Sequence, residues 1–375
     1  MLIKNGLVFT NNFKFEYKNI RIKDGIIIEL TEDDIDESRL DEYEKVLDAK
    51  DMLVIPGLTD IHFHGCVGYD FCDGTDEAIT EMAKFQLAKG VTNICPATMT
   101  LPKERLMEIC TVASKHQSNE EEADLVGINL EGPFISPKRC GAQNPEYVHK
   151  PEQEFLKDLI TASGGLTKLV TIAPEVEGAI ECIESLNGSI KFSVGHTVAE
   201  FEDADKAFKA GATHVTHMFN AMPAFTHRAP GVIGAAADDD KVMVEIICDG
   251  IHVHPSAVRT AFKIFGADRV ILISDSTRAC GMPDGKYELG GLPVFLKDGA
   301  VRLEDGTLAG SASNLFDCMV NVIKMGIPAE WAIKAATYNP AKAIGILDSC
   351  GSIEIGKKGE IVLLDKEYEI KQVIK

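Results

Sequence analysis

Residues 54–65 read VIPGLTDIHFHG, an apolar run that ends in two closely spaced histidines. Pro56 and Gly57 interrupt the run, and His62 and His64 follow it. Alternate side chains of a strand project from the same face, so these two imidazoles would point the same way. Two neighbouring imidazoles bind one divalent metal if the fold brings further ligands to them. The alternative is a core histidine satisfied by a backbone group, so the pair alone does not decide between the two.

The composition is that of an acidic globular protein of 375 residues. Asp and Glu number 58 against 38 Lys and Arg, a formal net charge of −20. Nucleic acids and anionic membranes need a basic surface, so we expect neither as a partner. A small anionic substrate stays compatible, because it needs only a local cationic group. The ten cysteines include no Cys-x-x-Cys pair, and no apolar run approaches the roughly 18 residues of a membrane span. We therefore expect a reduced, cytoplasmic protein.

The centre of the chain alternates short apolar runs with helical stretches. The eight runs span residues 54–63, 91–97, 124–131, 168–174, 190–195, 213–219, 242–249 and 269–275. Strands joined by helical crossovers pair in parallel, and eight of them close a barrel. An open doubly wound sheet is the alternative, but no Gly-x-Gly-x-x-Gly turn follows the first run. The pattern predicts an α/β fold, a (β/α)8 TIM-like barrel.

Both ends of the chain read as β-rich. Residues 2–30 alternate apolar and polar positions between turn signals, and residues 351–365 read as strand, turn, strand. We expect the two ends to form one small β-sandwich domain, made of residues 1–53 and 351–375. Residues 54–350 would then form the barrel.

Residue types that bind metals fall at the ends of five of the eight predicted strands. Chemistry in such barrels sits at the C-terminal ends of the strands, where these side chains would meet. A buried Glu or Asp can instead form a salt bridge, but the whole set in barrel order predicts a metal site. The set consists of His62, His64, Glu131, His196, His217 and Asp275.

Seven stretches carry a resemblance to a known family. They are PGLTDIHFHG (56–65), LEGPFISPKRCGAQNPE (130–146), VGHT (194–197), THMFNAMPAFTHRAPGVIGAA (216–236), CDGIHVHP (248–255), SDSTRACGMPDGKY (274–287) and LAGSA (308–312). Together they resemble the amidohydrolase superfamily and, within it, the N-acetylglucosamine-6-phosphate deacetylase family, essentially end to end. The His-x-His pair and the last-strand Asp are common to the superfamily, whereas LEGPF, the MFNAM run and DGIH are narrower and point to the sugar-phosphate deacetylases within it.

The resemblance implies a divalent metal cofactor, with zinc (Zn²⁺) or iron (Fe²⁺) expected first. Glu131, His196 and His217 would hold the primary ion, and His62 and His64 would form a second position. Some relatives lack the histidine pair and use one metal, so this chain would bind one or two ions per subunit.

The implied reaction is hydrolysis of an N-acetyl group to give glucosamine 6-phosphate and acetate, a step of amino sugar catabolism. A bound metal lowers the pKa of its water to about 7 and supplies hydroxide. Asp275 would take the proton and return it to the sugar nitrogen. The implied substrate contacts are Ala142, Gln143, Asn220, Ala221, Arg228, Asp249, Gly250, Ile251, His252, Leu308, Ala309 and Gly310.

Two of these contacts concern the phosphate, and one departs from the family pattern. Arg228 and His252 are the expected phosphate contacts, with His252 reaching a neighbouring active site in a homodimer. Gln143 stands where relatives have a histidine that polarises the carbonyl; an amide donates a hydrogen bond but cannot become cationic.

Two other functions remain open on the sequence. One is a different metal-dependent amidohydrolase, acting on another acylated sugar or a cyclic amide. The other is a non-catalytic scaffold, which would have lost metal ligands that this chain keeps.

Overall fold

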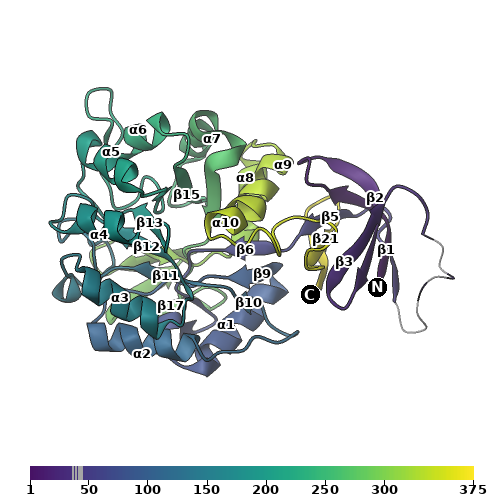
Figure 1. The fold of residues 1–375 in the computed structure, drawn as a ribbon, viewed down its shortest axis with the longest axis horizontal. Coiled ribbons are helices and arrows are strands. Elements are labelled where there is room, and N and C mark those ends of the chain that lie inside the picture. The colour runs from purple at the N-terminus through teal and green to yellow at the C-terminus, as the bar shows by residue number, and fades with distance from the viewer. Residues whose placement is uncertain (36–37, 39, 41–44) are drawn as a thin grey trace.

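A computed structural model describes residues 1–35, 38, 40 and 45–375. A large α/β body lies beside a smaller β domain that contains both chain ends (Figure 1). The small domain holds one seven-stranded sheet in the order β22-β21-β5-β1-β2-β3, with β4 paired to β1. Its strands are β1 (Leu2–Phe9), β2 (Phe15–Lys23), β3 (Ile26–Thr31), β4 (Val46–Asp48), β5 (Leu53–Pro56), β21 (Ile361–Leu364) and β22 (Ile370–Ile374).

The sheet joins the two ends of the chain directly. Strand β5 pairs with β1 on one side and with β21 on the other, so the segment that leads into the barrel is fixed between the N-terminal and C-terminal strands. A small domain built from both ends is therefore present. The predicted boundaries at residues 53/54 and 350/351 stay a prediction, and β5 crosses the first of them.

Eight parallel strands form the barrel, as predicted. They are β6 (Leu58–Asp60), β9 (Val91–Ile94), β11 (Ile128–Glu131), β12 (Thr167–Ile172), β13 (Lys191–Val194), β14 (His214–Val215), β15 (Met243–Ile247) and β16 (Val270–Ile273). A parallel bridge between Ala97 and Asn129 joins the first strands to the rest. The Asp275 N–H donates to the His62 carbonyl at 2.9 Å and closes the ring. A short strand, β10 (Asp124–Leu125), also pairs with β9.

Helices cover the outside of the barrel (Figure 1). Helices that connect successive barrel strands include α1 (Asp76–Ala88), α2 (Lys103–Ala113), α3 (Gln153–Ala162), α4 (Ala179–Leu186), α5 (Phe201–Ala210) and α7 (Pro255–Arg269). Helix α1 shows the local logic. The Thr75 hydroxyl accepts from the Ala78 N–H at its start, and Gly90 at φ 77° turns the chain into β9. Further helices are α6 (Gly231–Asp238), α8 (Leu315–Lys324), α9 (Ala329–Ala336) and α10 (Tyr338–Ala343).

A four-stranded antiparallel sheet between β16 and α8 was not anticipated. It consists of β17 (Gly285–Leu289), β18 (Leu292–Lys297), β19 (Ala300–Leu303) and β20 (Leu308–Ser311). Its buried side chains Leu289, Val294 and Val301 pack with Met99 near the mouth of the barrel. The sheet thereby carries the stretch 308–311 to the carboxyl ends of the barrel strands.

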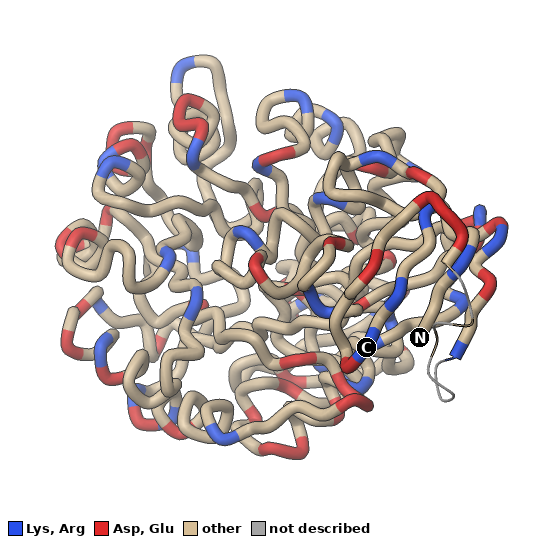
Figure 2. Tube along the Cα trace, turned by 45° about the vertical axis from the view of Figure 1, so that its right-hand side comes forward, with Lys and Arg blue, Asp and Glu red and all other residues tan. Residues whose placement is uncertain are grey.

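The surface agrees with the acidic composition. Acidic and basic residues are interspersed along the chain, without a basic stripe in this view (Figure 2). None of the helices in the described part of the chain has the length and apolar character needed to cross a membrane.

Candidate functional site

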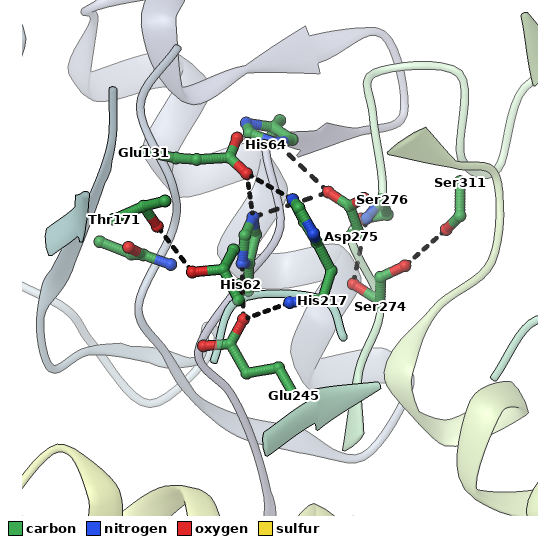
Figure 3. A network of polar contacts seen from close by, with 12 residues as sticks. His62, His64, Glu131, Thr171, His217, Glu245, Ser274, Asp275, Ser276 and Ser311 are labelled. Carbon is green, nitrogen blue, oxygen red and sulfur yellow. Dashed lines mark hydrogen bonds and ion pairs between the residues drawn. The ribbon is translucent and has the colours of Figure 1, made fainter. Parts of the chain in front are cut away.

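Five barrel strands deliver one compact group of side chains. His62 and His64 follow β6, Glu131 ends β11, His196 follows β13, His217 follows β14 and Asp275 follows β16. The predicted run 213–219 is a strand only over His214–Val215, and His217 lies in the turn beyond it. All six residues are buried, with exposures of 6% or less. The strand-end prediction therefore selected residues that the fold does bring together. Figure 3 shows the arrangement of His62, His64, Glu131, His217 and Asp275.

Glu131 lies at the centre of the group. Its Oε1 is 3.1 Å from His196 Nε2, 3.0 Å from His217 Nε2 and 3.2 Å from His62 Nε2. Its Oε2 is 3.3 Å from His64 Nε2. One carboxylate therefore faces four imidazole nitrogens, each of which points at it through the atom that would bind a metal.

Asp275 completes a second group beside the first. Its Oδ1 lies 3.3 Å from His64 Nε2 and 3.7 Å from His62 Nε2. Two overlapping sets of metal-ligand atoms result, His62 with Glu131 and His217, and His62 with His64 and Asp275. His62 belongs to both sets, so the two candidate metal positions lie next to each other.

The donor set fits a divalent metal. His196 Nε2 and His217 Nε2 lie 3.0 Å apart, close to the spacing of two nitrogens on one tetrahedral ion, about 3.3 Å with bonds of about 2.0 Å. His62 Nε2, which lies 3.2 Å from Glu131 Oε1, is buried without a hydrogen-bond partner among the described residues. Nitrogen and carboxylate ligands of this kind suit zinc and iron.

The charges in the group stabilise one another. Burial raises the pKa of Glu131, but the neighbouring His62 and His196 outweigh it and hold the pKa well below the ordinary value. Burial is likewise outweighed at Asp275, whose pKa is lowered mainly by its hydrogen bond with His64. His64 shows the reverse: burial lowers its pKa, and the two carboxylates raise it to about 10. The carboxylates thus stay ionised and attract positive charge.

The backbone at three of these residues is strained. His196, His217 and Asp275 have φ values of 46°, 27° and 48°, in a region that L-residues other than glycine rarely adopt. The orientation of His196 is fixed in addition by its Nδ1, which lies 2.9 Å from the Arg139 carbonyl. Such strain persists only where surrounding contacts enforce it, and it aims these side chains into the centre of the barrel mouth.

Gln143 is held by two hydrogen bonds. The Thr100 N–H donates to its Oε1 at 2.6 Å, and its Nε2 donates to Glu131 Oε2 at 2.6 Å. Because a backbone N–H can only donate, the amide orientation is defined. The side chain is 3% exposed. Gln143 therefore orients the central carboxylate, and one N–H of the amide remains for a ligand.

A cavity of about 540 Å³ opens over the group. Twelve of the eighteen predicted site residues line it: His64, Glu131, Ala142, Gln143, His196, His217, Asn220, Ala221, His252, Asp275, Leu308 and Gly310. Six do not. His62 is fully buried, Ala309 is buried in the β17–β20 sheet, and Arg228 is exposed. The remaining three, Asp249, Gly250 and Ile251, form the turn that precedes His252.

Residues 249–252 form a turn in which Asp249 orients His252. Asp249 Oδ2 lies 2.7 Å from His252 Nδ1, and its Oδ1 accepts from the Ile251 and His252 N–H groups at 2.9 Å. Burial lowers the pKa of His252, but the Asp249 carboxylate raises it overall. His252 lines the cavity of its own chain. Its expected reach into the active site of a neighbouring subunit stays a prediction.

Some site residues were missed. Lys138, Arg139 and Cys140 line the cavity. The signal available for them was the pair of adjacent cations inside the stretch 130–146. Glu245 contacts His62 with its Oε2 3.0 Å from Nδ1. Its signal was a charge in the middle of the apolar run 242–249.

The comparisons with known proteins agree with this geometry. A model of the amidohydrolase family matches residues 53–375. N-acetylglucosamine-6-phosphate deacetylase of Bacillus subtilis (strain 168) is 37% identical, over 99% of this chain and 94% of that protein. N-acetylgalactosamine-6-phosphate deacetylase of Escherichia coli O157:H7 is 33% identical over 86% of each. A mutant N-acetyl-D-glucosamine-6-phosphate deacetylase from Mycobacterium smegmatis, solved in complex with N-acetyl-D-glucosamine-6-phosphate, has a TM-score of 0.91 and 30% identity over 100% of this chain and 97% of that one.

The geometry yields a test of the metal group. The His196→Asn variant should bind the metal at least about tenfold more weakly than the native protein and should lose it on dialysis. The reason is that the substitution removes one of the nitrogens that face Glu131. His214→Asn is the matched control, since His214 is an equally buried histidine outside the group. Metal content per chain, measured by elemental analysis, would be unchanged in the control. Equal retention by both variants would contradict the assignment of His196.

Proposed function

The chain belongs to the amidohydrolase family and, within it, to the N-acetylglucosamine-6-phosphate deacetylases, and from this premise we propose that it hydrolyses N-acetylglucosamine 6-phosphate to glucosamine 6-phosphate and acetate. One observation carries the proposal. One cavity is lined by an ionised Asp275, by the cationic groups His252, Lys138 and Arg139, and by four of the metal-type residues, His64, Glu131, His196 and His217. A phosphorylated acyl sugar needs this combination of a hydrolytic centre and positive charge in one cavity.

Glu131, His196 and His217 would hold the primary metal, with His62 and His64 at a second position. A divalent ion there, zinc or iron, supplies an acidified water and Lewis-acid polarisation of a carbonyl. The second position makes two ions per chain possible.

Asp275 is the proposed proton carrier. Its lowered pKa keeps the carboxylate ionised, so it can accept a proton from the attacking water. It then returns this proton to the sugar nitrogen as the C–N bond breaks, because an amide anion is too basic to leave without one. The second N–H of Gln143 would donate to the carbonyl oxygen, as a neutral donor rather than a cationic one.

The phosphate would meet the cationic side of the cavity. We assign His252 to the site of its own chain. Arg228 is exposed and does not line the cavity of its own chain. We therefore propose that it binds the phosphate in the active site of the neighbouring subunit of a homodimer. Guanidinium suits phosphate because it donates two parallel hydrogen bonds. All ten cysteines are free thiols, which supports the proposal of a cytoplasmic enzyme.

Acetate release tests the proposed reaction. Metal-replete protein should release acetate from N-acetylglucosamine 6-phosphate and little from unphosphorylated N-acetylglucosamine, because the cationic groups have no partner in the latter. N-acetylgalactosamine 6-phosphate belongs in the same assay, since a relative carries that activity in its name. No release from any of the three would reject the proposal.

Asp275→Asn tests the proton carrier. We expect kcat to fall by about 10²–10⁴-fold, the usual contribution of a general acid–base group. Metal content should be nearly retained if the ion is held mainly through Glu131, His196 and His217. Asp240→Asn, at a fully exposed aspartate, is the charge-matched control. A turnover near the native value in Asp275→Asn would exclude Asp275 from proton transfer.

The pH dependence of KM tests His252. Its raised pKa means that the imidazolium persists above pH 6.5 and loses its charge only as the pH rises further. KM for the phosphorylated sugar should therefore be low at neutral pH and increase on the alkaline side. Asp249→Asn removes the carboxylate that raises this pKa, so the increase should begin at lower pH. An unchanged KM profile in Asp249→Asn and in His252→Gln would remove His252 from phosphate binding.

A further inference from the structure

Glu245 is a charged residue in the interior of the barrel. It occupies the middle of β15, between Val244 and Ile246, and its side chain is 0% exposed. A carboxylate buried among aliphatic side chains costs several kcal/mol unless other groups compensate its charge. The groups that contact the Glu245 carboxylate therefore indicate its role.

These contacts go to two of the proposed metal ligands. Glu245 Oε2 lies 3.0 Å from His62 Nδ1, and the same oxygen accepts from the His217 N–H at 3.3 Å. The Glu245 carbonyl accepts from the Met218 N–H at 2.7 Å. Glu245 thus lies behind the two histidines, on the side away from Glu131 (Figure 3).

We propose that Glu245 is a positioning residue for both metal positions. Glu245 accepts a hydrogen bond from the His62 Nδ1–H. This contact selects the tautomer whose Nε2 carries no proton and faces Glu131 and Asp275. A carboxylate behind a ligating imidazole also makes that imidazole a stronger ligand. The inference rests on the proposed function for its part in the reaction, but its effect on metal binding stands apart from any substrate.

The second contact acts on the backbone. His217 holds φ at 27°, a conformation that needs outside support. Glu245 supplies this support through two hydrogen bonds. Its carboxylate accepts from the His217 N–H, and its backbone carbonyl accepts from the N–H of the next residue, Met218. One residue of β15 therefore couples His62, which belongs to both ligand sets, to the strained turn that carries His217.

Two substitutions separate positioning from simple structure. Glu245→Met keeps the approximate volume and removes both acceptor contacts, and Glu245→Gln keeps an amide oxygen but loses the charge. Glu360→Gln is the matched control, because Glu360 is also a buried carboxylate but contacts Thr92 and Asn93 beside the small domain.

The measurement is titration of metal-stripped protein with Co²⁺ and Zn²⁺ against a chromophoric chelator, together with the visible absorption of the Co²⁺ form. Glu245→Met should bind metal about 10–100-fold more weakly and show a changed Co²⁺ spectrum, and Glu245→Gln should bind about tenfold more weakly. Glu360→Gln should match the native affinity and spectrum, whatever its thermal stability.

Native affinity, stoichiometry and spectrum in Glu245→Met would overturn the proposal and leave Glu245 a structural residue. If Glu245→Met does not fold, native behaviour of folded Glu245→Gln would overturn it equally. Weakened metal binding in these variants, combined with no acetate release by the native protein, would retain the role of Glu245 and reject the proposed reaction. Acetate release by the native protein with unchanged metal binding in the variants would support the proposed reaction and reject the role of Glu245.

Discussion

The structure depends on a carboxylate that cannot be buried alone. Glu131 is 2% exposed at the end of β11, where an unpaired charge would cost several kcal/mol. Imidazoles carried by β6, β13 and β14 surround it, and they reach it only when the eight-stranded ring closes. The closure of the barrel and the assembly of the site are therefore one condition. A strand out of register would leave Glu131 without its partners as well as misplacing the core.

The parts of this arrangement that follow from local rules were predictable. Apolar runs separated by helical stretches indicated a parallel barrel, and polar residues at the ends of the runs indicated which side chains meet there. His62, Glu131 and Asp275 were found in this way. The β17–β20 sheet was missed although its turn was visible in the sequence: Asp298-Gly299, with φ values of 51° and 78°, forms the two-residue hairpin turn that this dipeptide favours.

Other features depend on contacts between distant segments. Thr100 holds Gln143 from 43 residues away, and Glu245 meets His62 from 183 residues away. No spacing rule places those groups together. Asp249 differs, since its hydrogen bonds to the residues just after it are a local turn, yet only the three-dimensional structure shows that the turn presents His252 to the cavity of its own chain.

Gln143 shows how such a distant contact changes the reading of a substitution. Compared with the histidine that the family resemblance leads us to expect here, it has no capacity for charge, which by itself suggests a weakened site. In the structure its oxygen accepts from Thr100 and its nitrogen donates to Glu131. A neutral imidazole that bridged the same two groups would use both of its nitrogens, one as acceptor and one as donor. The glutamine makes both bonds and retains one N–H. Orienting the central carboxylate and meeting a substrate are therefore compatible in one amide, and the substitution does not by itself cost the site a donor.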